Sequence, residues 1–464
     1  MFNHGYVTFE GIECIYIIEK GRINLIPTHE EDLRKLFTHS EKQHFLFRFS
    51  DGIDKNCIAF IERVEMNLGF SLYLYPQYVF TMMNTGPITT MQITGDAIDE
   101  IFHPSNYYYM KYRSGIENNV DLTNSVEIAD KWTFVMDGQE ICVALQYGGI
   151  LYRGIASEAR LRPQLIMTFV PTTDTAFLFK MYSVVTRFLQ LAQYNSNYGE
   201  CTVELSSNSI GKNTGYLWDC TGIGGKRNFY SEVRYRSIKP YISKLLQFSA
   251  DNLNISVDCL PKNKYRWSRI DYTSQDVDAL FAAFESEYKA NKQLFESEPE
   301  EDLNRIKELT LQKIGECSTD DISEVEKKFL SQVKKSIKSI GIQTGQKTKI
   351  KNVLHVLNTV LKTSAENLFV QGRIGTEEGF SEDEISKISK TIVGLRSRAS
   401  HDNSLIVFDD LQAEHIHFLE ILVYALMLIR AGINDEGIEV VLGLVFHCNH
   451  RYMDILLEDN DSRM

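Results

Sequence analysis

The feature that most constrains the fold is a change of sequence pattern at about residues 246–272. Before it, short runs rich in Tyr, Phe, Ile, Val and Thr alternate with Gly-containing breaks, which is typical of β-strands joined by turns. After it, apolar residues recur every three or four positions among Glu, Asp and Lys, which is typical of amphipathic helices. Because 464 residues also exceed the usual size of one core, we expect an α+β, multidomain protein.

Residues 1–245 are expected to form a β-rich N-terminal domain with one packed helix. The helix is predicted at about Thr173–Tyr194, where apolar residues follow helical spacing. Asp137 and Gly138 separate two predicted strands and favour a hairpin turn between them. The clearest strand-like segments are Ile12–Ile18, Cys57–Val64, Ser71–Met82, Trp132–Val135, Glu140–Gln146 and Gln164–Val170.

Residues 246–272 are expected to connect this domain to an all-α helical bundle formed by residues 273–464. Apolar positions within the charged stretch 297–345 favour amphipathic helices there over a linker. Further helices are predicted at about 347–370, 381–398, 410–432 and 435–449. The predicted helix caps are Thr273 or Ser274 for the first helix, and a capping box of Ser381 and Glu384 for a later one.

The net charge of −13 excludes a protein that coats nucleic acid through general electrostatic attraction. Any chemistry on nucleic acid must therefore depend on a local basic site. The eight cysteines are scattered without zinc-ligand spacing, so we expect reduced cysteines, no bound metal and no cofactor. A helix would place His415 and His417 on different faces, and we interpret them as surface or core histidines.

The sequence carries no sign of export or of membrane insertion. The N-terminus lacks the basic and apolar regions of a signal peptide. The most apolar stretch, Phe418–Ile433, contains Glu420 and Arg430 and is too short to span a bilayer. These features predict a soluble, cytoplasmic protein with no membrane contact.

Arg396 and His401, near the end of the predicted helix 381–398, are residues of the types that can cut RNA without a metal. A histidine, with an ordinary pKa of about 6.5, can exchange a proton with the ribose 2′-OH or the leaving 5′-oxygen. A guanidinium stays charged and can stabilise the extra negative charge of the transition state. Five helical positions correspond to about 140° around the axis, so we expect the two side chains to meet only if the helix ends or bends near Ala399.

The Arg–His spacing alone is not specific, because four to six residues separate such a pair at Arg22–His29, Arg34–His39 and Arg396–His401. The first two pairs lie in the β-rich half. The third lies at the end of a helix in the predicted bundle, with a strongly apolar helix after it. In this arrangement the C-terminal domain resembles the HEPN superfamily. The N-terminal half is similar to that of ApeA-type anti-phage proteins, through Gly21–Leu25, Gly95–Pro104 and the aromatic strands.

The resemblance implies a metal-independent endoribonuclease that forms a homodimer through its HEPN-like helical domain, so that two motifs meet in one cleft. It implies that Arg396 and His401 are catalytic. Ser397 stands where the family commonly has Asn, Asp or His. The candidate accessory RNA-binding residues around the pair are Ser397, Arg398, Asp402 and Asn403.

A second candidate for nucleic-acid contact is the segment Lys226–Lys239, where basic and aromatic residues alternate. A β-strand with one basic solvent face explains the pattern at least as well. The candidate contact residues are Lys226, Arg227, Arg234 and Arg236.

The leading hypothesis is an anti-phage abortive-infection effector, in which a β-rich N-terminal sensor responds to an unknown phage-derived trigger and an HEPN domain cleaves RNA. The alternative is a non-catalytic helical dimerisation or binding protein that acts as a sensor or scaffold. A third hypothesis, a carbohydrate or nucleotide binder with its own enzymatic site, has no paired-carboxylate or nucleophile pattern to support it.

Overall fold

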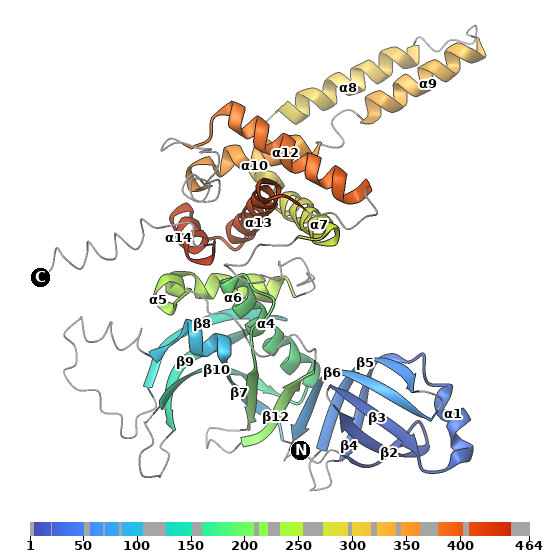
Figure 1. Cartoon of the computed structure of the whole chain (residues 1–464), viewed down its shortest axis with the longest axis vertical. Coiled ribbons are helices and arrows are strands. Elements are labelled where there is room, and N and C mark those ends of the chain that lie inside the picture. The colour runs from blue at the N-terminus through green and yellow to red at the C-terminus, as the bar shows by residue number, and fades with distance from the viewer. Residues whose placement is uncertain are drawn as a thin grey trace, which may run out of the picture. The chain divides into compact units, whose positions relative to one another are not determined.

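The computed structural model divides the chain into two compact units, Met1–Tyr265 and Arg266–Met464 (Figure 1). The first contains a large antiparallel sheet and the second contains helices, which confirms the expected mixed α+β composition. The sequence-based boundary at residue 245 falls inside helix α6 (Ile242–Asp251), which belongs to the first unit. The structure describes residues 4–19, 21–50, 56–67, 70–82, 86–104, 127–150, 160–207, 213–220, 233–253, 272–295, 299–316, 323–339, 345–361, 379–401 and 408–446.

The sheet of the first unit is antiparallel and runs in the order β1-β2-β3-β6-β12-β11-β7-β10-β9-β8, with β5 paired to β6 and β4 to β5. Strand β6 joins its two parts, because Leu72–Leu74 pair with β3 and Tyr78–Met82 pair with β12. The strands are β1 (His4–Phe9), β2 (Ile12–Glu19), β3 (Arg22–Pro27), β4 (Gln43–Ser50), β5 (Asn56–Asn67), β6 (Ser71–Met82), β7 (Ile88–Gly95), β8 (Glu127–Met136), β9 (Gln139–Ile150), β10 (Arg160–Thr172), β11 (Cys201–Ser206) and β12 (Asn213–Asp219).

Each of the six predicted strand segments lies within an observed strand, and Ser71–Met82 coincides with β6. The predicted hairpin turn is also confirmed. Asp137 and Gly138 join β8 to β9 with φ values of 50° and 76°, the left-handed conformation that a two-residue hairpin turn requires.

The predicted packed helix is α4 (Thr175–Gln193), which begins and ends within two residues of the expected bounds. The Asp174 carboxylate caps it by accepting hydrogen bonds from the backbone amides of Ala176 and Phe177. Helix α6 packs against α4 and against β8, an edge strand of the sheet. The Gln247 amide pairs with both backbone groups of Val135 on β8, at 2.8 and 3.1 Å, and so covers part of that edge.

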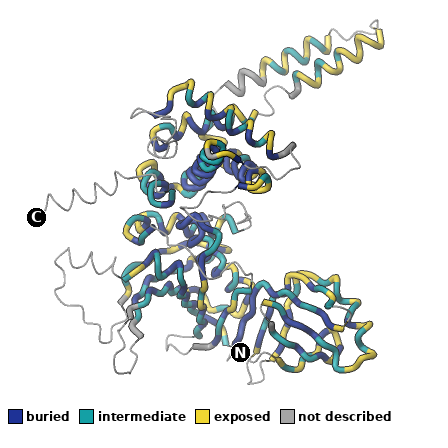
Figure 2. The backbone as a smooth tube through the Cα atoms, viewed as in Figure 1, coloured by how far each residue is buried: buried dark blue, intermediate teal, exposed yellow. Residues whose placement is uncertain are grey.

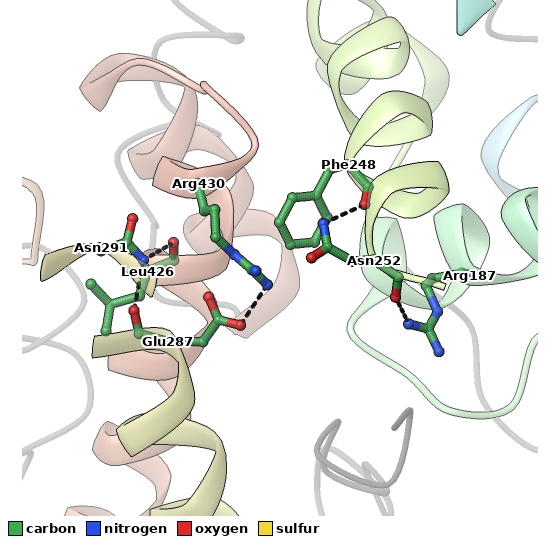
Figure 3. Close-up of polar contacts among 7 residues, drawn as sticks. All are labelled: Arg187, Phe248, Asn252, Glu287, Asn291, Leu426 and Arg430. Atoms are coloured by element: carbon green, nitrogen blue, oxygen red, sulfur yellow. Dashed lines mark hydrogen bonds and ion pairs between the residues drawn. The ribbon is translucent and has the colours of Figure 1, made fainter. Parts of the chain in front are cut away.

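The end of α6 is tied to α4 by side-chain contacts to backbone carbonyls (Figure 3). Arg187 of α4 donates to the carbonyl oxygen of Asn252, and the Asn252 amide donates to the carbonyl oxygen of Phe248 at 2.7 Å. The short helices of this unit are η1 (Glu30–Asp32), α1 (Leu33–Phe37), α2 (Asp96–Ile101), α5 (Tyr235–Ile238) and η2 (Lys239–Tyr241).

The second unit is helical throughout its described residues, which agrees with the expected all-α domain. Helix α13 contacts α7, α12 and α14, and α12 also contacts α7 and α10. These helices are α7 (Ser274–Ala290), η4 (Lys292–Leu294), α8 (Pro299–Glu316), α9 (Glu324–Ser339), α10 (Gln346–Val356), α12 (Glu382–His401), α13 (Asp410–Arg430) and α14 (Asp435–Phe446).

Helices α7 and α13 are joined by an ion pair inside the unit (Figure 3). Arg430 Nη2 lies 2.7 Å from Glu287 Oε1, and Glu287 is almost fully buried. Asn291 donates from its amide to the carbonyl oxygens of Glu287 and Leu426, at 2.9 and 3.2 Å. Burial raises the pKa of Glu287, although the nearby Arg430 charge opposes the rise.

Helix α13 is long and apolar enough, by length and composition, to cross a membrane over Leu411–Arg430, but most of that stretch is buried inside the structure. The predicted apolar stripe, which includes Ile416, Leu419 and Val423, is buried. These are the features of a core helix.

Candidate active site on helix α12

Helix α12 begins at the capping box that the sequence predicts. The Ser381 backbone amide and hydroxyl both donate to Glu384 Oε2 at 2.8 Å, and the Glu384 amide donates to the Ser381 hydroxyl at 3.4 Å. Residues spaced three or four apart form its buried stripe: Ile385, Ile388, Ile392, Leu395 and Ala399. The stripe orients the rest of the helix, so the side chains near its C-terminal end have defined surroundings.

Arg396 lies beside this stripe and is half-buried. Its guanidinium carbon is 5.4 Å from the centre of the ring of Phe281, a buried residue of α7. Such a cation–π contact contributes about 0.5–2 kcal/mol and restricts the side chain. Arg396 is therefore held by a second helix while its charge stays near the surface.

The helix does not end near Ala399, which corrects the expectation from the sequence. It continues to His401, where the described backbone stops. Arg396 and His401 are thus about 140° apart around one helix axis. The side chain of His401, and residues Asp402 and Asn403, lie outside the described part of the structure. Ser397 and Arg398 are exposed, and the Ser397 hydroxyl donates to the Val393 carbonyl oxygen at 3.4 Å.

The surface of α12 around position 401 is basic. Lys387, Lys390 and Arg398 are exposed, and each lies within about 60° of position 401 around the axis. Gly394, on the same side, leaves the helix backbone open, since nothing lies within 4 Å of the position that a Cβ would take. A net-acidic chain therefore carries a local cationic face next to the candidate histidine.

The second candidate for nucleic-acid contact is not a strand where the structure describes it. Arg234 precedes the short helix α5, and Arg236 is exposed on it. Tyr235 is buried against Phe102 and Trp132, with ring centres 5.7 and 6.2 Å away, so it cannot stack on a base. The strand interpretation is therefore wrong over Val233–Lys239. Lys226 and Arg227 lie outside the described residues.

The histidines of α13 belong to its packing. His415 is buried, its Nδ1 is 2.8 Å from the Leu411 carbonyl oxygen, and burial lowers its pKa. His417 Nδ1 lies 2.8 Å from Glu420 Oε2 and 3.4 Å from the Tyr272 hydroxyl. Burial, together with Glu420, raises the pKa of Tyr272. This polar cluster connects the residue before α7 to α13, and the sequence offered only one signal for it, a glutamate in an apolar helix.

A second buried polar cluster lies in the sheet unit and has no counterpart in the sequence-based predictions. Asp219 accepts hydrogen bonds from the hydroxyl groups of Tyr182, at 2.9 Å, and Tyr198. Burial raises the pKa of both tyrosines, and the Asp219 charge adds to the rise. The three residues come from α4, the following loop and β12, so no local pattern could indicate that they meet.

Within the described ranges, no three His, Cys, Asp or Glu side chains are grouped so that they could hold a metal ion. Compared with known protein families, with curated proteins and with solved structures, the chain has no match. The candidate function therefore depends on the residues of α12 and their surroundings.

Proposed function

We propose that the chain is a metal-independent endoribonuclease of the HEPN type, with Arg396 and His401 as its catalytic residues. The observation that carries the proposal is the cationic face of α12. Three exposed basic residues and the half-buried Arg396 surround the approach to position 401 in a chain of net charge −13. Such a face binds a polyanion through its phosphates.

In the proposed reaction His401 accepts the proton of the ribose 2′-OH, and the 2′-oxygen attacks the adjacent phosphorus. The bond to the 5′-oxygen breaks, and that oxygen takes up a proton. Arg396 stabilises the added negative charge on the phosphate oxygens, because a guanidinium presents a fork of donors that remains charged. The products are a 2′,3′-cyclic phosphate and a 5′-hydroxyl end.

The site needs a second copy of the chain. One straight α12 directs Arg396 and His401 about 140° apart, so the two cannot close on a single phosphate. Two α12 helices that face each other can present Arg396 from one copy and His401 from the other. Ser397 and Arg398, both exposed, add RNA contacts beside that cleft.

The sheet unit acts as the sensor of an anti-phage abortive-infection effector in the cytoplasm. A ribonuclease in that compartment damages its host unless it is held inactive, so a regulatory unit is required. The trigger is a phage-derived molecule that binds the N-terminal unit.

The test compares wild type with Arg396→Ala, His401→Ala and the matched control Arg48→Ala, an exposed arginine in the sheet unit. Cells that express each variant are challenged with phage, and their RNA is examined for cleavage and for 2′,3′-cyclic phosphate ends. We expect wild type and Arg48→Ala to cleave and protect, and both α12 variants to lose cleavage and protection. Cleavage by both α12 variants at the wild-type level contradicts the proposal.

One observation favours the alternative, a non-catalytic dimerisation or binding protein. The contact with Phe281 gives Arg396 a structural role that needs no substrate. Protection by every variant, without RNA cleavage in any of them, supports this alternative.

A further inference from the structure

Helices α8 and α9 form a pair that projects from the other helices of the second unit (Figure 1). They pack against each other and are joined by a short connection, so they run antiparallel. None of the described side chains at 305–316 and 323–337 is buried, as Figure 2 shows by the absence of dark blue along both helices. The pair is amphipathic, yet it has no core of its own.

Large apolar side chains on both helices face solvent. On α8, Ile306 and Leu309 are 57% and 51% exposed, and on α9, Val325 and Phe329 are 78% and 64% exposed. Each pair is one helical turn apart and so lies on one side of its helix. Contiguous apolar surface of this kind marks an interaction site.

The two exposed stripes lie on the same side of the hairpin. The half-exposed apolar residues between the helices are Leu311 and Ile314 on α8, and Leu330, Val333 and Ile337 on α9. At about 100° per residue, each exposed stripe is displaced by roughly 100–120° from these residues, in the direction of decreasing residue angle on both helices. Equal displacements on antiparallel helices point to the same side, so the hairpin presents one apolar face.

The charges of the two helices are opposite. Three basic and five acidic residues give α8 a net charge of −2, whereas five basic and two acidic residues give α9 a net charge of +3. The two helices together are nearly neutral, although the whole chain carries −13. Two copies of a strongly acidic chain repel each other, and this hairpin is a place where that repulsion is small.

We propose that the apolar face of the α8–α9 hairpin binds the same face of a second copy of this chain. A two-fold axis parallel to the hairpin places α8 of one copy over α9 of the other. The result is a four-helix bundle in which all neighbouring helices are antiparallel and each contact between copies joins an acidic helix to a basic one. The inference concerns assembly and does not depend on whether the chain cleaves RNA.

The size of the face fits a reversible dimer. A face two helices wide and 16 residues long measures about 20 by 24 Å, which gives roughly 1,000 Å² of surface buried over both copies. That area is at the lower limit for a specific interface, so the dimer should dissociate on dilution.

The test measures molar mass by light scattering over a dilution series of the full-length chain without RNA. The disrupting variant is Leu309→Glu with Phe329→Glu, and the matched control is Phe70→Glu, an exposed phenylalanine of the sheet unit. We expect wild type and control to be dimeric at high concentration, and the disrupting variant to be monomeric with unchanged helix content. Because both residues are exposed, their replacement should leave the fold intact.

A second variant tests which helices meet. Reversal of Lys327, Lys328 and Lys335 to glutamate makes α9 acidic, and we expect it to weaken the dimer at least tenfold, more so at low salt. A monomeric wild-type chain, or a Leu309→Glu, Phe329→Glu variant that remains dimeric, overturns the proposal. A dimer unaffected by the charge reversal overturns the pairing of α8 with the α9 of the other copy. RNA cleavage is a separate readout, so failure here is distinguishable from failure of the proposed nuclease.

Discussion

The guanidinium carbon of Arg396 lies 5.4 Å from the centre of the Phe281 ring. The two residues are on α12 and α7, more than a hundred positions apart in the chain. The proposed phosphate-binding group is therefore positioned by long-range packing, which makes Phe281 a positioning residue whose effect can be measured separately from that of Arg396.

Replacement of Phe281 by leucine keeps an apolar side chain in the core but removes the aromatic face under Arg396. We expect RNA cleavage to fall about tenfold, because small misplacements of a catalytic group cost large factors in rate. The control is Phe284→Leu, which makes the same change at a buried position of the same helix. Equal loss of cleavage in both variants would show that general loosening of α7, and not the ring contact, is responsible.

The cap of α7 gives a prediction for stability. The Asp276 amide donates to the Thr273 hydroxyl at 3.2 Å, and the Thr273 amide donates to the Asp276 carboxylate at 2.9 Å. We expect Thr273→Ala to lower the free energy of unfolding of the helical unit by about 1 kcal/mol. Urea unfolding followed by circular dichroism measures the loss, and Gln275→Ala, at an exposed position in the same turn, should change it little.

The buried Glu287 predicts a pH dependence. Burial raises its pKa in the folded chain above the ordinary value of 4.5, so the folded state holds this proton more tightly than the unfolded state. The contribution of Glu287 to stability should therefore fall as the pH rises from about 4.5 through the folded-state pKa. Relative to wild type, Glu287→Gln should gain stability over that range, as measured by urea unfolding at several pH values. A constant difference between the two proteins contradicts the prediction.

The Arg430 partner predicts an asymmetry. Arg430→Met leaves the Glu287 carboxylate buried without its counter-ion, and we expect a loss of about 3–5 kcal/mol at neutral pH. Replacing both residues, Glu287→Gln with Arg430→Met, should restore much of that stability, because no charge then remains in the core. A double variant as unstable as the single one would show that the ion pair itself, and not the unpaired charge, determines the effect.

The hydroxyl of Tyr272 predicts a local effect on the cluster with His417 and Glu420. Tyr272→Phe keeps the ring and removes one polar contact in a buried environment, for which we expect a loss of about 1–2 kcal/mol. The comparison is Tyr6→Phe, whose hydroxyl belongs to an exposed residue of β1 and should change the unfolding midpoint very little.

Elements with strong local signals could be predicted with close bounds. Alternating aromatic and β-branched residues predicted β6 over Ser71–Met82, and helical spacing predicted α4. The capping box at Ser381 predicted where α12 begins. Its end was predicted wrongly, because Arg396–His401 contains neither a glycine nor a proline that would stop the helix, and the helix continues to His401.

Contacts between distant segments could not be predicted. Tyr235 looked like part of a basic, aromatic strand, but it lies in α5 and packs between Phe102 and Trp132. The cluster of Tyr182, Tyr198 and Asp219 and the contact of Arg396 with Phe281 involve residues that are remote in the chain.

The sequence by itself determined which face of each helix and strand is apolar, because side-chain direction follows the backbone period of 3.6 or 2 residues. It also determined that Arg396 and His401 stand near the end of a helix in the helical half. Only the tertiary structure decided what each face packs against: Phe281 beneath Arg396, a basic exposed surface around position 401, and an apolar hairpin face with no neighbour in the described chain. The physical reason is that packing partners are selected by the summed burial of many distant residues, which no local pattern contains.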